Sequence, residues 1–105
     1  MTRPVRLARA ARAELNEATA WYRDHGAELG ESFLASIDEA IERLRRLAPH
    51  LGAAPGTDPS LHIRRVFVKR FPYSIYFIDL PSHVRVLAIA HARRRPIDWS
   101  ARLPR

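Results

Sequence analysis

The order of apolar and polar positions predicts two amphipathic helices in the first half of the chain. Over residues 8–24, apolar side chains recur every three to four positions, and Gly26 follows as a helix terminator. A wider stripe of the same period covers residues 29–48, where Pro49 ends the helix. Because so few residues join the two segments, we expect an antiparallel helical hairpin. Its large aromatic side chains are expected to pack in the core: Trp21, Tyr22 and Phe33.

The pattern of residues in the second half of the chain predicts β-strands. The runs 62–69, 73–79 and 84–92 are rich in β-branched and aromatic residues and partly alternate, and the short links between them predict an antiparallel meander. A short run at 3–7 predicts a first strand at an edge, and 49–61 reads as a surface loop. Both strand faces are apolar near the centre. Since the hairpin covers only one face, we expect the other to stay partly uncovered, available to a partner.

Length and composition narrow the class of protein. A chain of 105 residues predicts one domain over 1–105. No apolar run approaches the ~20 residues that span a bilayer, and the first residues lack the apolar core of a signal peptide, so we expect a cytoplasmic protein without membrane contact. Cysteine is absent and no histidine spacing typical of metal sites occurs. We therefore expect neither a metal nor a cofactor.

The net charge of +7 lies entirely in the second half of the chain. Residues 1–48 hold eight arginines and eight acidic residues, whereas residues 49–105 hold ten basic and three acidic residues. The densest cluster is the run Arg93, Arg94 and Arg95, directly after the last predicted strand, and His91 lies at the end of that strand. This distribution indicates a neutral scaffold that presents a cationic surface to an anionic partner.

Residue types in the strand half restrict the chemistry available there. A glycine-rich phosphate loop, a nucleophile elbow and a pair of carboxylates are all missing. An enzyme built on this half would have to use Arg, His, Lys and Tyr, which suits RNA cleavage, where a hydroxyl is deprotonated and cations stabilise the phosphorane.

Several short motifs occur in a set order along the chain. They are Ala11–Leu15 with Ala20-Trp21-Tyr22, Gly30–Leu34, Ile63–Val68, Arg70–Phe77 and Val86–Arg94. Together they make residues 5–99 resemble the RelE/ParE superfamily of type II toxins, closest to the ParE-like branch of plasmid stabilisation proteins. The resemblance implies an α+β fold of order β-α-α-β-β-β. In this fold a helical hairpin packs on one face of a small, mostly antiparallel four-stranded sheet.

The resemblance also implies a toxin that arrests growth and is neutralised by a cognate antitoxin of the ParD or RelB type in a hetero-oligomer. Such antitoxins are often acidic, which would match the charge of this chain. ParE-like members poison DNA gyrase and are not enzymes, whereas RelE-like members cleave mRNA on the ribosome. We favour the gyrase poison and keep the ribosome-dependent mRNA endoribonuclease as the alternative.

Site residues follow from the same resemblance. For a nuclease, the matching positions are Arg65 or Arg70, His91 and Arg93, but the tail position that holds a tyrosine in RelE-like members is Trp99 here. An indole cannot replace the tyrosine as a proton donor or base, which favours the gyrase poison. The predicted target-binding surface is Arg65, Arg70, His91, Arg93, Arg94 and Trp99.

Overall fold

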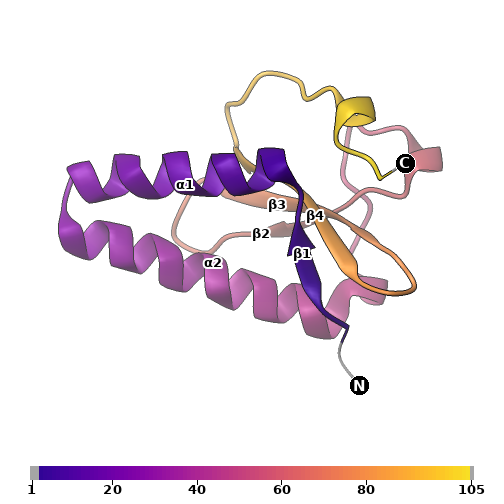
Figure 1. The fold of residues 1–105 in the computed structure, drawn as a ribbon, viewed down its shortest axis with the longest axis horizontal. Coiled ribbons are helices and arrows are strands. Elements are labelled where there is room, and N and C mark those ends of the chain that lie inside the picture. The colour runs from indigo at the N-terminus through magenta and orange to yellow at the C-terminus, as the bar shows by residue number, and fades with distance from the viewer. Residues whose placement is uncertain (1–2, 105) are drawn as a thin grey trace.

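The computed structural model describes residues 3–104, and in it a pair of helices lies in front of a four-stranded sheet (Figure 1). The helices are α1 (Arg9–Asp24) and α2 (Ala27–Leu47), and the strands are β1 (Val5–Leu7), β2 (Arg64–Phe67), β3 (Tyr73–Asp79) and β4 (Val84–His91). Single-turn 3₁₀ helices are η1 (Ala48–His50), η2 (Pro59–Leu61) and η3 (Trp99–Ala101). The expected α+β order β-α-α-β-β-β is confirmed.

The two helices form the predicted hairpin. Gly26, in the link between them, has φ 152°, a backbone conformation that residues with a side chain rarely adopt. At Gly30, a Cβ atom would lie 3.3 Å from Cα of Arg23, so the absence of a side chain lets the helices approach closely.

The hairpin buries its apolar stripe against one face of the sheet. Phe33 and Ile37 are fully buried there, and Phe33 stacks on Tyr22 with ring centroids 4.8 Å apart. Burial of each such side chain stabilises the fold by about 1.5–3 kcal/mol. The expectation for Trp21 is wrong, since its side chain is 55% exposed. Adjacent helical residues point about 100° apart, so Tyr22 takes the core direction and Trp21 faces outward.

The sheet is mixed and has the strand order β1-β4-β3-β2. β1 pairs with β4 in parallel, while β2–β3 and β3–β4 are antiparallel, as the meander predicts. The central strand β3 is buried from Ser74 to Ile78, on both of its faces.

A β-bulge changes the alternation of β4. Tyr76 pairs with Ala88, but the next residue on β3 pairs with Val86, so Leu87 is an extra residue in β4. Val86 and Ile89 face the hairpin, whereas Leu87 and Ala88 both face the opposite side. The simple alternation expected for this strand is therefore wrong beyond Val86.

The opposite face of the sheet is covered by the chain itself, which corrects the expectation of an open face. Tyr76, Leu87 and Ala88 are buried in a second core. Two segments build this core over the sheet, namely the 49–63 connection and the tail after β4, which lie side by side in Figure 1. The covering side chains are Ala54, Leu61, Ile63, Ile97, Trp99 and Leu103. Short irregular segments with few apolar residues thus cover the face that the strand pattern alone leaves open to a partner.

Side chains and loops also close the outer edge of β2. The N–H of Arg65 donates to Gly52 O at 3.3 Å, and the carbonyl of Phe67 accepts from Arg43 Nη2 at 2.6 Å. An edge closed in this way is protected from pairing with another chain. Within residues 3–104, neither helix is long and apolar enough to cross a membrane.

Candidate functional site

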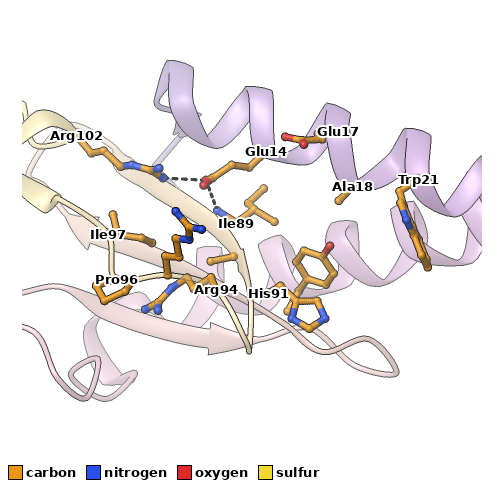
Figure 2. A pocket seen from close by; sticks show the side chains of 13 residues that line it. Glu14, Glu17, Ala18, Trp21, Ile89, His91, Arg94, Pro96, Ile97 and Arg102 are labelled. Atoms are coloured by element: carbon orange, nitrogen blue, oxygen red, sulfur yellow. Dashed lines mark hydrogen bonds and ion pairs between the residues drawn. The ribbon is translucent and has the colours of Figure 1, made fainter.

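A cavity of about 540 Å³ lies between α1, the last part of β4 and the tail (Figure 2). It exists because β1 is short: β1 pairs only with Val84, Arg85 and Val86, so the following part of β4 has a strand, β3, on one side only. The lining residues are Glu14, Glu17, Ala18, Trp21, Tyr73, Ile89, Ala90, His91, Arg94, Arg95, Pro96, Ile97 and Arg102.

Two charged side chains replace the missing strand neighbour at the base of this cavity. The N–H of Ile89 donates to Glu14 Oε1 at 3.1 Å, and Arg102 Nη1 donates to the carbonyl of Leu87 at 3.2 Å. Glu14 and Arg102 also bind each other at 2.8 Å, as the dashed lines in Figure 2 show. The ion pair thus satisfies backbone groups of β4 and ties the tail to α1.

Aromatic side chains form the other end of the cavity. The rings of Tyr73 and His91 meet edge to face with centroids 5.2 Å apart. Trp21 stacks on His25 at 3.8 Å, on the exposed side of α1. Burial raises the pKa of Tyr73, and the neighbouring Tyr22 and Glu17 raise it further. Tyr73 is therefore a neutral hydrogen-bonding group at neutral pH and not a base.

The polar residues His91, at the end of β4, and Arg94, after it, have different surroundings. His91 Nδ1 accepts the N–H of Arg93 at 3.0 Å, which places the imidazole proton of a neutral ring on Nε2. Arg94 donates from Nη2 to the hydroxyl of Tyr76 at 3.1 Å, and its guanidinium lies 5.1 Å from the centre of that ring. Arg94 thus links the cavity to the second core.

The structure does not gather the six predicted surface residues into one site. His91 and Arg94 line the cavity. Trp99 is half-buried against Tyr76, at a centroid distance of 5.2 Å. Arg65 belongs to the same row of the sheet, since its Cα pairs with that of Tyr76.

The other two predicted residues lie at one end of the sheet. Arg70 is in the β2–β3 turn with φ 71°, and Arg93 is exposed just after β4. The two loops are neighbours, because the N–H of Ala92 donates to the carbonyl of Pro72 at 2.8 Å. These two arginines are therefore presented at the same end of the sheet, outside the cavity.

Sequence reasoning missed several charged and aromatic residues of the cavity. Trp21 carried a usable signal, since it and Tyr22 cannot both face the core of one helix. Glu14 and Arg102 carried none, because their pairing depends on where a tail 88 positions away returns. The others are Glu17 and Tyr73. Within the described residues, His, Asp and Glu side chains do not gather into a group of three that could hold a metal ion.

Comparison with known proteins identifies the family of the chain. Residues 5–96 match the family model described as the ParE toxin of the type II toxin–antitoxin system parDE. The fold is similar to a solved structure from the chromosomal ParDE toxin–antitoxin system of P. aeruginosa, with a TM-score of 0.72 and 22% sequence identity. That similarity covers 85% of this chain and 95% of the other. No curated protein matches the chain significantly. Since the family model spans most of the sequence, the chain belongs to the ParE toxin family of type II toxin–antitoxin systems.

Proposed function

We propose that this ParE-family toxin arrests growth by poisoning DNA gyrase in the cytoplasm, and that a cognate antitoxin holds it inactive. The observation that carries the proposal is the family match over residues 5–96, which the β-α-α-β-β-β fold supports. On this account the protein is not an enzyme: it acts by binding gyrase, and it stays bound to its antitoxin in a hetero-oligomer until released.

The arrangement of the cationic and titratable groups favours a binding protein over a nuclease. A general base must stand within hydrogen-bond reach of the proton it removes, beside cations that stabilise the phosphorane. Arg65 and Arg70 lie outside the cavity that His91 lines. Trp99 has no titratable group and packs on Tyr76, and the pKa of Tyr73 is raised, opposite to the change that a base requires.

A nuclease remains the second candidate because of one observation. His91 lines an open cavity together with Arg94, so an acid–base group and a cation share one space. A ribosome-dependent mRNA endoribonuclease would use Nε2 of His91, since Nδ1 is occupied by the N–H of Arg93. In that case His91→Ala would abolish mRNA cleavage without weakening antitoxin binding.

The surface offered to the antitoxin is the helical hairpin. The second face of the sheet is closed, whereas Trp21, Leu29 and Leu47 on the helices are 55%, 37% and 39% exposed. These side chains provide apolar anchors of the kind that dominate binding energy at interfaces. An acidic partner would add electrostatic attraction to a chain of net charge +7.

Induction of the chain in a bacterial host tests the proposal. We expect growth arrest, an SOS response and intact mRNA, with arrest and SOS response suppressed when the cognate antitoxin is expressed with it. The matched variants are His91→Ala and His50→Ala, an exposed histidine outside the cavity. Arrest of the wild type and His50→Ala with an SOS response and intact mRNA agrees with gyrase poisoning, and weaker arrest by His91→Ala would place His91 on the target-binding surface. Cleaved mRNA that only His91→Ala abolishes would establish the nuclease, and normal growth would overturn both.

A further inference from the structure

One end of the sheet carries a group of cations that the proposed function has not yet used. We define the cationic rim as Arg65, Lys69, Arg70 and Arg93. Arg65 lies in β2 beside Tyr76 and its guanidinium lies over Phe67, the last residue of that strand, whereas the others come from the β2–β3 turn and the segment after β4. The hydrogen bond from Ala92 to Pro72 brings the last two segments together. Within residues 3–104, the one ion pair of the rim is Lys69 with Glu39, at 3.8 Å.

The acidic residues of the strand half lie elsewhere. Asp79 ends β3 at the opposite end of the sheet, where it pairs with Arg3. Asp58 and Asp98 each accept the N–H of the serine two positions later, so both cap 3₁₀ turns. The positive potential of the rim is therefore not cancelled by acids of the sheet itself.

The rim arginines direct their guanidinium groups to the surface and do not belong to the apolar core. The guanidinium of Arg65 lies 4.5 Å from the ring centre of Phe67, which is 61% exposed, so the ring orients a cation at the surface. Arg70 has φ 71°, a conformation that costs a residue with a Cβ about 1–2 kcal/mol compared with glycine. A charged residue in such a conformation points to a role for its side chain.

We infer that the cationic rim binds the phosphate backbone of double-helical DNA. An arginine fork binds two phosphate oxygens at once, and the two neighbouring loops present Arg70 and Arg93 at the same end of the sheet. A single strand would need free aromatic faces for base stacking, but Arg65 already covers the exposed ring of Phe67. Beside the rim the exposed large apolar side chain is Phe67, which the guanidinium of Arg65 partly covers, whereas the hairpin exposes three such side chains to a protein partner.

The biological consequence of this inference rests on the proposed function, because DNA binding would help the toxin to engage gyrase while gyrase holds DNA. The hairpin and the rim are separate surfaces, so one molecule can present an apolar side to a protein and a cationic end to DNA. DNA binding is measured without gyrase, so its failure and the failure of gyrase inhibition are separate results.

Fluorescence anisotropy of the full chain with a labelled duplex of about 20 base pairs tests the inference across a salt series. The rim variant is Arg70→Gln with Arg93→Gln, and the control is Arg12→Gln with Arg46→Gln, two exposed helix arginines whose loss changes the net charge equally. We expect low-micromolar binding at low salt, a loss of roughly 10-fold or more in the rim variant, and a log–log salt slope reduced by about 2. The control should change less than about two-fold.

Three results would overturn the inference: equal losses in both variants, no binding of the duplex at low salt, or displacement of the duplex by polyglutamate or single-stranded DNA at equal charge concentration. Arg70→Gly separates binding from folding. It should unfold at a higher denaturant concentration than the wild type yet bind the duplex more weakly. Undiminished binding by this variant would remove Arg70 from the site.

Discussion

Glu14 and Arg102 form an ion pair with Oε1 and Nη1 2.8 Å apart, although 88 positions separate them in the chain. Both also bind the backbone of β4, at Ile89 and Leu87, on the side where that strand has no neighbouring strand. A single pair therefore closes an open strand edge and holds the tail across the second core. Arg94 and Trp99 lie in the same tail, where each contacts Tyr76.

Replacement of Glu14 by alanine should destabilise the protein. It leaves the N–H of Ile89 and the guanidinium of Arg102 without their acceptor, which costs about 1–3 kcal/mol in a partly buried setting. Urea denaturation followed by circular dichroism measures the change. The control is Glu17→Ala, an exposed acid on the same helix and cavity wall, which should stay within about 0.5 kcal/mol. Equal losses in both variants would show that the ion pair contributes nothing.

Because the second face of the sheet is closed, replacing either of two aromatic residues should change the free energy of unfolding by different amounts. Trp99→Ala should lower the free energy of unfolding by about 1–3 kcal/mol, because the indole packs on Tyr76 over the second core. Phe67→Ala should change it by less than about 0.5 kcal/mol, since that ring is 61% exposed. Thermal unfolding of both variants measures the difference. A larger loss for Phe67→Ala would contradict the assignment of the tail to the second core.

The sequence predicted the elements because each depends on local periodicity. The stripe of α2, the turn residues near Pro72 and Pro81 and the apolar runs of the strands are all readable within a few residues. Two features could not be predicted from the sequence, for a physical reason. The bulge at Leu87 depends on how β4 pairs with β3, and the cover of the second face depends on where the tail returns. Neither is encoded in a local pattern.

The candidate site was less predictable than the fold. His91 and Arg94 were identified because they end a strand inside a cationic run, and both line the cavity. Arg65 and Arg70 carry equal charge but lie on other strands or turns, since charge alone does not specify position. Glu14 and Trp21 lie on α1, where the apolar pattern predicts only which face is buried.

Gly30→Ala should destabilise the helical hairpin despite the higher helix propensity of alanine. The added methyl group would lie 3.3 Å from Cα of Arg23, so the two helices would have to separate slightly. We expect a net loss of about 0.5–2 kcal/mol, since overpacking costs more than the propensity gain. In the control Gly52→Ala, the new Cβ meets no atom within 4 Å and stability should hardly change. Chemical denaturation that ranked the two in the reverse order would contradict the close helix approach.

Tyr73 should ionise only above pH 10. Burial raises its pKa and the charge of Glu17 adds to the effect, so folding favours the protonated phenol. Its contribution to stability is then fully present below pH 10 and is lost as pH rises through the folded-state pKa. Tyrosinate absorbance of the wild type and Tyr73→Phe isolates this group, and Glu17→Gln should move its pKa back toward 10. Ionisation of Tyr73 below pH 10 would reopen a role for it as a base.

The most direct test of the central claim uses purified toxin, DNA gyrase and a relaxed plasmid. We expect the toxin to block supercoiling and to trap cleaved plasmid DNA, and a stoichiometric amount of cognate antitoxin to reverse both effects. Unchanged supercoiling without cleaved DNA, together with cutting of mRNA on purified ribosomes, would contradict the account.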